Sequence, residues 1–289
     1  MIILDGIIII NKEKGYTSND VVQIIKKTFN EKVGHTGTLD PMATGVLPIL
    51  IGKGTLLSKY LINHDKIYVA TLKLGVKTDT GDITGNILEE KNVDDKCLQK
   101  ENIQKALEEI IGEQEQIPPM YSAIKVNGKK LYEYARKGQK INIPPRIINI
   151  YNTELLNIDY KNNEIQFRVS CSKGTYIRTL CETIAEKLNN IGTMSALNRE
   201  KVGNFEINQS VKINELKETF DNKCLISLEK FFENKDKIEL TPRSFVAFLN
   251  GVKLLTDNKD GIYRIYNINK EFIGVGIVKN GILKRDIVI

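Results

Sequence analysis

The stretch IQFRVSCSKGTYIRTLCETIAEKL, residues 165–188, indicates the fold class because one periodicity replaces another within it. Apolar and polar residues alternate from 165 to 171, and a period of two predicts a strand. Ser-Lys-Gly-Thr at 172–175 predicts a turn. Apolar residues at 177, 180, 184 and 188 then share one helical face. The sequence therefore predicts a strand that leads directly into a helix.

The neighbouring segments extend this pattern. Alternation over 67–72 predicts another strand. Thr17 and Asp20 have capping-box spacing, which predicts a helix from there to about Phe29. Apolar spacing over 103–111 predicts an amphipathic helix, with Gly112 at its C-cap. Because these elements follow no regular βαβ order, we predict an α+β fold with a mixed sheet and helices packed on it.

The sequence changes character near residue 238, after the charged stretch 233–237. Thr241 and Pro242 predict a helix start, and Gly251 predicts its end. Short β-like runs follow at 263–268, 272–278 and 282–289. We therefore predict two domains, 1–237 and 238–289, the second a small β-rich barrel.

Composition excludes several classes of protein. The chain has 289 residues, of which 41% are hydrophobic and 27% charged, and this balance excludes a disordered or fibrous chain. Its apolar runs are shorter than the roughly 18 residues that span a bilayer, and no secretory signal is recognisable, so we expect a cytoplasmic protein. Four cysteines without CxxC spacing and two histidines argue against zinc. Residues 52–55, Gly-Lys-Gly-Thr, do not complete a P-loop, which argues against nucleotide hydrolysis.

The positive charge is concentrated in one segment, 121–149. Its net charge of +6 equals the formal excess of the whole chain, and it also contains Tyr121, Tyr132 and Tyr134. Cations interleaved with aromatic rings suit a nucleic acid, whose phosphates bind cations and whose bases stack on rings. The residues alone leave a nucleic-acid surface and a solvated basic loop equally open. The cations are Lys125, Lys129, Lys130, Arg136, Lys137, Lys140 and Arg146.

The segment 34–45, GHTGTLDPMATG, predicts a tight irregular loop because it contains three glycines and a proline. Asp40 precedes Pro41 and is therefore disfavoured from the α region. Such a loop can present one carboxylate in a fixed direction for catalysis. Asp40 could equally cap the next turn, as aspartates before proline often do.

At this point the motifs resemble those of a known family. Residues 34–48, GHTGTLDPMATGVLP, closely resemble the catalytic motif of the TruB family of pseudouridine synthases, which isomerise one uridine, position 55, in the T loop of tRNA. Further blocks follow in the family's order: KIY at 66–68, TDTGD at 78–82, PPMYSAIK at 118–125 and CSKGTYIRT at 171–179. The C-terminal segment resembles the small PUA-type RNA-binding module.

The resemblance implies roles for individual residues. Asp40 matches the catalytic carboxylate, Tyr68 lies against a flipped base, and Arg178 pairs with Asp40. Three further matches, His35, Tyr176 and Leu197, contact the RNA or the base, and Asp82 is a polar partner in the same cleft. The segment 121–149 corresponds to a tRNA-gripping insertion, whose substrate-binding residues include Lys125, Lys129 and Lys130. The implied fold is a mixed-sheet synthase domain flanked by helices.

The same resemblance implies partners and cofactors. The isomerisation has no net redox change, so we expect neither cofactor nor metal. We expect a monomer that binds the T arm of tRNA, without a membrane and without an obligatory protein partner.

The sequence departs from the family pattern at two positions, and two other functions stay open. Glu13 replaces a proline that is usual in the family, and Asn198 replaces an arginine, which puts a role for position 198 in doubt. A non-catalytic RNA-binding or tRNA-chaperone protein could use the same basic segment and C-terminal module. Such a binder has no use for a carboxylate facing a polyanion. A guide-RNA-dependent relative that modifies ribosomal RNA is the alternative within the same class.

Overall fold

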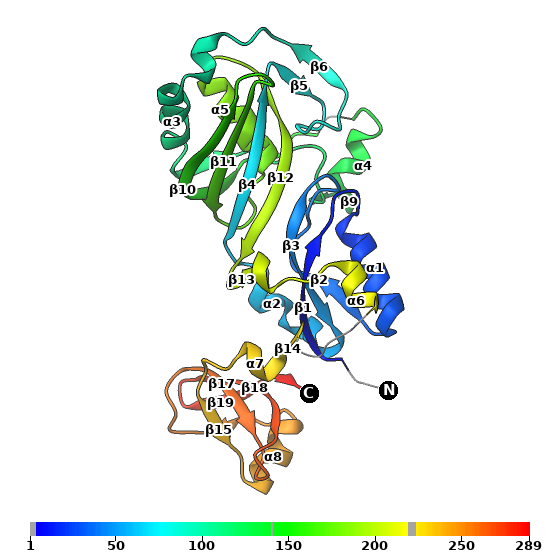
Figure 1. Cartoon of the computed structure of the whole chain (residues 1–289). Helices are drawn as coiled ribbons and strands as arrows, with labels where there is room; N and C mark the ends of the chain where they lie inside the picture. The colour runs from blue at the N-terminus through cyan, green and yellow to red at the C-terminus, as the bar shows by residue number, and fades with distance from the viewer. Residues whose placement is uncertain (1–3, 140, 219–223) are drawn as a thin grey trace.

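A long mixed sheet runs through most of the chain (Figure 1). The computed structural model describes residues 4–139, 141–218 and 224–289. The strands of the sheet are β1 (Gly6–Lys12), β2 (Val33–His35), β3 (Thr44–Ile51), β4 (Lys66–Leu74), β7 (Gly112–Gln116), β10 (Arg146–Asp159), β11 (Glu164–Cys171), β12 (Gly192–Val202), β13 (Phe205–Glu206) and β14 (Leu225–Ser227). Their order is β14-β1-β3-β12-β4-β11-β10-β7, with β2 added on β3 and β13 on β12.

Helices alternate with the strands along the chain, and several of them pack on this sheet. They are α1 (Ser18–Phe29), α2 (Ser58–Leu61), α3 (Lys100–Glu108), α4 (Leu131–Ala135), α5 (Ile177–Lys187), α6 (Ile213–Glu218), α7 (Leu228–Phe231) and α8 (Pro242–Leu249). Buried residues of α1, α3 and α5 share one apolar core with residues of β3, β4, β10 and β11. Strand β11, a turn and α5 follow one another as predicted, and the capping box of Thr17 and Asp20 begins α1.

One parallel pairing joins the two halves of the sheet. Strands β3 and β12 pair in parallel at Thr44 with Asn198 and at Gly45 with Arg199, whereas the other pairings in this sheet are antiparallel over the described residues. Gly45 has φ +106°, and a Cβ there would lie 2.3 Å from the Arg199 carbonyl oxygen. Only glycine permits this approach, and the predicted mixed sheet is confirmed.

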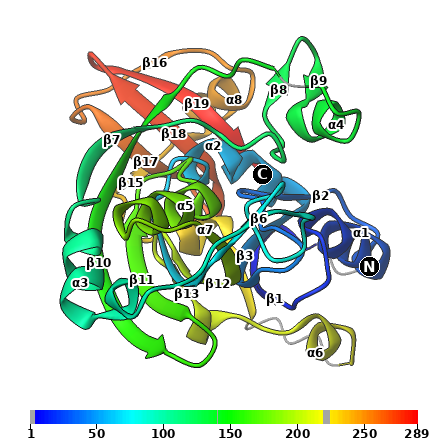
Figure 2. The ribbon, with the colours of Figure 1, turned by 90° about the horizontal axis from the view of Figure 1, so that it is seen from above.

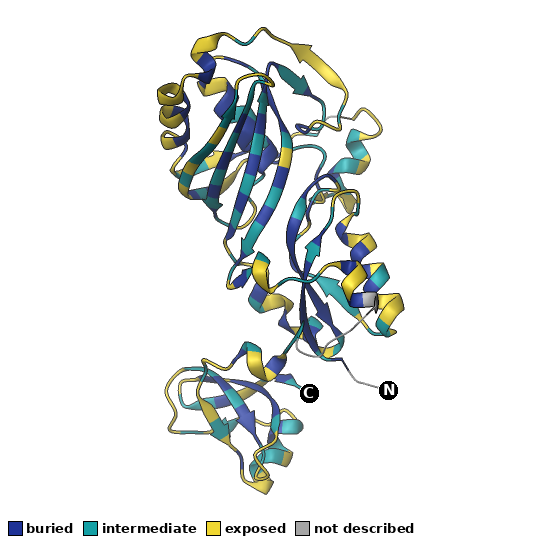
Figure 3. Ribbon diagram, viewed as in Figure 1, coloured by how far each residue is buried: buried dark blue, intermediate teal, exposed yellow. Residues whose placement is uncertain are grey.

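Strand β1 shows why an all-isoleucine run forms a strand here. Ile8 and Ile10 enter the core under α1, while Ile7 and Ile9 enter a second core on the opposite face. A strand buried on both faces reads as a continuous apolar run rather than an alternating one. Figure 3 shows β1 and β3 as almost wholly buried, whereas residues of β4 and β11 alternate between buried and half-buried.

The C-terminal segment forms a second sheet with its own core. Its strands are β15 (Lys237–Glu239), β16 (Leu254–Leu255), β17 (Gly261–Tyr266), β18 (Phe272–Lys279) and β19 (Ile282–Val288), in the order β15-β17-β18-β19-β16. Thr241 caps α8, as predicted. Val275 and Ile287 also join the core below β1, and Asp286 accepts hydrogen bonds from Tyr60 and Lys59. Among the described residues, no helix is long and apolar enough to cross a membrane.

The basic segment forms a hairpin of β8 (Lys125–Val126) and β9 (Lys129–Lys130), followed by α4. Figures 1 and 2 show it projecting from the body of the molecule near β2. Residues 146–149, which we assigned to this segment, belong instead to β10. Lys140 lies outside the described residues.

One helix prediction is wrong at its end. Helix α3 stops at Glu108 with Glu109 as its C-cap, and Gly112 is the first residue of β7 rather than the cap. Ile111, which we placed on the apolar face, is 45% exposed. The chain already turns away at Glu109, so the last apolar spacing does not reflect a helix.

Candidate active site

Asp40 lies in the loop between β2 and β3, and backbone contacts hold this loop from both sides. The Ser18 hydroxyl accepts from the Leu39 N–H at 2.8 Å and lies 3.2 Å from the Leu39 carbonyl oxygen. The Pro41 carbonyl accepts from the Gly15 N–H at 2.8 Å and from the Lys12 ammonium at 3.3 Å. The carboxylate is thereby presented in one direction, with 29% of its side chain exposed.

Lys12 is fully buried and braces the same loop. Its ammonium also donates to the carbonyl oxygens of Tyr16 at 2.6 Å and Glu13 at 3.0 Å. Burial lowers the pKa of Lys12 to about 8, and the nearby Asp40 opposes this shift. Glu13, the first departure from the family pattern, therefore contributes a backbone carbonyl to the turn.

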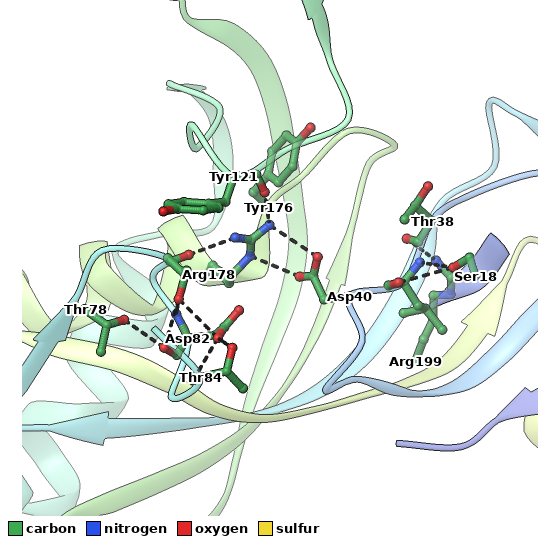
Figure 4. A network of polar contacts seen from close by, with 12 residues as sticks. Ser18, Thr38, Asp40, Thr78, Asp82, Thr84, Tyr121, Tyr176, Arg178 and Arg199 are labelled. Atoms are coloured by element: carbon green, nitrogen blue, oxygen red, sulfur yellow. Dashed lines mark hydrogen bonds and ion pairs between the residues drawn. The ribbon is translucent and has the colours of Figure 1, made fainter. Parts of the chain in front are cut away.

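Arg178 binds Asp40 side-on, which confirms the predicted pairing. Its Nε lies 3.0 Å from Asp40 Oδ2 and its Nη2 lies 3.3 Å from Oδ1 (Figure 4). The same guanidinium donates to the carbonyl oxygens of Thr80 and Tyr121, both at 2.8 Å. Arg178 is 5% exposed, so three loops meet at one buried cation.

Burial dominates the electrostatics of Asp40. It raises the pKa of the carboxyl above its ordinary value, while Arg178 acts in the opposite direction and Asp82 reinforces the rise. The carboxylate is half-buried, and its partial loss of hydration disfavours the charged form.

Asp82 lies close by but faces its own loop. This loop connects β5 (Val76–Thr78) to β6 (Ile87–Glu90). Asp82 Oδ1 accepts from the Thr84 N–H at 2.9 Å, and from the hydroxyls of Thr84 at 2.5 Å and Thr80 at 3.2 Å. The carboxylate thus orders the loop that presents the Thr80 carbonyl to Arg178.

Tyr68 and Arg199 form a second group beside this pair. They are directly opposite each other on β4 and β12, so the positive charge of Arg199 acts on the Tyr68 hydroxyl. Arg199 is 1% exposed and donates to the carbonyl oxygens of Val46 at 2.7 Å, Gly37 at 3.0 Å and Thr38 at 3.4 Å. Burial raises the pKa of Tyr68, whereas Arg199 opposes the rise.

Sequence reasoning missed Arg199. It belongs to the Leu197-Asn198-Arg199 motif on β12. Residues two positions apart on a strand point to the same face, so the spacing could have placed Arg199 on the same face as Leu197. The Arg199 side chain donates to the Gly37 and Thr38 carbonyl oxygens of the Asp40 loop. Position 198 itself carries a buried Oδ1 without a hydrogen-bond partner.

The three other residues that were expected to contact RNA or the base, His35, Tyr176 and Leu197, lie on β2, at the start of α5 and on β12. His35 ends β2, and its Nδ1 accepts from the Gly37 N–H at 3.3 Å. Burial lowers the pKa of His35, with Arg199 adding to the effect. Tyr176 is the N-cap of α5, two residues before Arg178, and Leu197 is a buried residue opposite Ala70.

The three predicted lysines lie on the projecting hairpin, apart from the Asp40–Arg178 pair. Lys125 and Lys130 are cross-strand partners, and Lys129 follows the Asn127-Gly128 turn. Like charges directly opposite each other destabilise a hairpin unless an anion lies between them. Lys130 and Arg136 also lie over the Tyr132 ring. The hairpin therefore places several cations around one aromatic ring.

No three His, Cys, Asp or Glu side chains converge as a metal site within the described ranges. The chemistry that the arrangement offers is that of one carboxylate fixed by a guanidinium, with a buried phenol nearby.

Family models match both parts of the chain. Residues 26–177 match "TruB family pseudouridylate synthase (N terminal domain)", and residues 237–285 match "Pseudouridine synthase II TruB, C-terminal". The tRNA pseudouridine synthase B of Clostridium kluyveri is 42% identical over 96% of this chain and 96% of its own length. The protein of the same name from Clostridium acetobutylicum is 44% identical over 94% of this chain and 95% of its own.

Solved structures agree on the fold. A structure described as "Crystal Structure of a Cbf5-Nop10-Gar1 Complex" superposes with a TM-score of 0.68 at 28% identity, over 96% of this chain and 79% of the other. A structure of an H/ACA RNP bound to a substrate RNA gives a TM-score of 0.69 at 24% identity, over 99% of this chain and 85% of the other.

The match of the N-terminal family model over residues 26–177 defines the class of the protein as a pseudouridylate synthase, an isomerase. With both family models matched and relatives above 40% identity along nearly the whole chain, this chain belongs to the TruB family of pseudouridine synthases.

Proposed function

We propose that this protein converts uridine 55 in the T loop of tRNA to pseudouridine, with Asp40 as the catalytic carboxylate. The observation that carries the proposal is the side-on pair of Asp40 and the buried Arg178, at 3.0 and 3.3 Å. The names of the relatives, tRNA pseudouridine synthase B, support tRNA as the substrate.

The reaction needs one reactive carboxylate rather than two. The N1–C1′ bond breaks, the base turns, and a C5–C1′ bond forms; C5 then loses a proton and N1 gains one. Asp40 serves as a nucleophile toward the sugar or base, or as a base that removes a sugar proton. Glycoside hydrolysis instead uses a pair of carboxylates. Here the other nearby carboxylate, Asp82, is directed at its own loop.

The uridine must leave its stack to reach this site, at a cost of a few kcal/mol. The basic hairpin and the Tyr132 ring supply contacts to the RNA that offset this cost. Tyr68 contacts the flipped base and accepts or relays the proton that leaves C5, with the charge of Arg199 acting on its hydroxyl. His35, Tyr176 and Leu197 contact the RNA or the base.

We also propose that residues 238–289 act as a separate PUA-type RNA-binding domain, and that the chain works as a cytoplasmic monomer. The separate core of the second sheet supports the division. The strand β15 begins at Lys237, so the second sheet starts one residue before the proposed boundary.

Release of the C5 hydrogen tests the proposal. A tRNA transcript made with [5-³H]uridine should release tritium to water when incubated with the protein and no cofactor, with at most one equivalent per tRNA. No release, or release far above one equivalent, would contradict a single modified position.

The rate should depend on pH through Asp40. The carboxylate must be ionised to act, and because burial raises its pKa it takes up a proton at a higher pH than an ordinary aspartate. The acid limb of the single-turnover rate should therefore have its midpoint above about 4. A rate that stays constant down to pH 4, with tRNA still bound, would contradict this assignment.

The hairpin lysines should determine how binding depends on salt. Replacing Lys129, Lys130 and Lys137 by Gln should weaken tRNA binding, and should reduce the slope of log K against log salt by about 0.7–0.9 per lost phosphate contact. The fold should survive, because these side chains lie on the projecting segment. Filter binding across a salt series measures the slope.

A matched control makes the same charge change elsewhere. Lys96, Lys100 and Lys105 are exposed and lie in or just before α3, far from the hairpin in both views (Figures 1 and 2). Their replacement by Gln should leave the slope nearly unchanged. Equal slopes for the two triple variants would show that the hairpin is only a solvated loop.

A further inference from the structure

Gln116, the last residue of β7, makes two hydrogen bonds to the backbone of one residue of α5. Its Oε1 accepts from the Tyr176 N–H at 2.8 Å, and its Nε2 donates to the Tyr176 carbonyl oxygen at 3.1 Å. Gln116 is 6% exposed, so water does not compete for these bonds. Two bonds from one planar amide fix both the position and the orientation of the peptide groups that they contact.

The contact falls where α5 begins. Tyr176 is the N-cap residue, and its own side chain makes no capping hydrogen bond. The N–H of Tyr176 itself donates to the Gln116 amide oxygen. The first turn of α5 therefore takes its position from a side chain of another strand. Arg178 is the second residue of that turn.

A second contact ties the same two segments together. Arg178 Nη2 donates to the Tyr121 carbonyl oxygen at 2.8 Å, five residues beyond Gln116. Pro118 and Pro119 lie between the two contacts, and each proline ring fixes φ near −65°. The segment 116–121 is thus a stiff strap that is attached to α5 at both ends. It leads directly into the basic hairpin.

The strap links the basic hairpin, which we propose binds tRNA, to the Asp40 carboxylate. From Tyr121 the chain enters the hairpin that carries Lys125, Lys129 and Lys130. In the other direction, the guanidinium that binds the Tyr121 carbonyl also binds Asp40. A displacement of Tyr121 at the base of the hairpin would therefore move the Arg178 guanidinium, which binds Asp40.

We propose that Gln116 is a positioning residue, which sets the first turn of α5 and thereby holds the Arg178 guanidinium against Asp40 and the base of the tRNA-binding hairpin. The inference rests on the proposed function of Asp40. Gln116 itself touches neither substrate nor reacting atoms. Its contribution is to the rate of the bound complex rather than to affinity.

The decisive variant is Gln116→Met, which keeps the side-chain length and removes both hydrogen bonds. The single-turnover rate at saturating tRNA should fall at least about tenfold, since a small misplacement of a catalytic pair is costly. The dissociation constant for tRNA should stay within about twofold. The control is Gln114→Met on the same strand, because Gln114 donates only to the Ile110 carbonyl, at 2.7 Å, and not to α5.

A double-mutant cycle separates positioning from general destabilisation. If Gln116 acts through Arg178, Gln116→Met should cost less than about twofold in rate when Arg178→Lys is already present. Equal losses in both backgrounds, or a loss no larger than that of Gln114→Met, would overturn the proposal. Thermal unfolding confirms that each variant is folded at the assay temperature. Where Gln116→Met is not folded, Gln116→Glu, which keeps the acceptor, replaces it in the same cycle.

The two proposals fail differently. An unsubstituted protein that releases no tritium from the tRNA would contradict the proposed function. An unsubstituted protein and a Gln116→Met variant that release tritium equally fast would contradict only the role of Gln116.

Discussion

Replacing Asp40 by Asn should reduce pseudouridine formation to less than about 3% of the unsubstituted rate, while tRNA binds as well or more tightly. In the proposed function the Asp40 carboxylate is the group that reacts, and its amide isostere cannot replace it. Binding should not suffer, because the change removes a negative charge from a surface that contacts phosphates. Single-turnover kinetics and filter binding on the same preparations measure the two quantities.

The control for this change is Asp65→Asn, at an exposed aspartate that accepts a hydrogen bond from Tyr151 at 3.1 Å. Its turnover should match the unsubstituted protein. Turnover of the Asp40→Asn variant above a few per cent would mean that Asp40 orders its loop and that another group performs the reaction.

Replacing Tyr68 by Phe should leave tRNA binding nearly unchanged but lower the rate of pseudouridine formation at least about a hundredfold. The ring keeps its π-face, which is worth about 1–3 kcal/mol in stacking on a base. The hydroxyl, on which the charge of Arg199 acts, is lost. If this hydroxyl accepts or relays the proton that leaves C5, the reaction should stall after the glycosidic bond has been broken.

Tyr68→Leu and Tyr151→Phe complete the comparison. The Leu variant should also bind tRNA less well, because it loses the ring. The Tyr151→Phe variant removes a partly exposed hydroxyl on β10 and should be active. Near-normal turnover of Tyr68→Phe would show that Tyr68 contributes only a packing surface.

Local signals predicted much of the secondary structure from the sequence. The capping box at Thr17 and Asp20, the alternation over 165–171 and the Thr241-Pro242 start each depend on neighbours within about four residues, and all three are confirmed. The end of α3 was missed because a glycine after an apolar helix predicts a cap, whereas here it begins a strand at φ +111°. The Asn127-Gly128 turn was also missed, although both residues have positive φ and the dipeptide is the usual sign of a hairpin.

The resemblance predicted Asp40 and Arg178 as site residues, but it did not predict the residues that position the site, such as Arg199 and Gln116. Asp40 and Arg178 are 138 residues apart, and no periodicity relates them. Arg199 and Gln116 act through carbonyl and N–H groups of distant segments, and a sequence does not specify backbone partners. Charge alone left the basic segment open between two interpretations. The structure adds the cross-strand lysines and the cations over the Tyr132 ring, on which the proposed RNA contact depends.

The most direct test of the proposed function is to map the product by mass spectrometry. An unmodified tRNA transcript is incubated with the protein and no cofactor, then derivatised at pseudouridine, cleaved and sequenced by mass. We predict one pseudouridine per tRNA, at position 55 of the T loop, and none with the Asp40→Asn variant. Pseudouridine at another position, or unmodified uridine 55 after complete binding, would contradict the account.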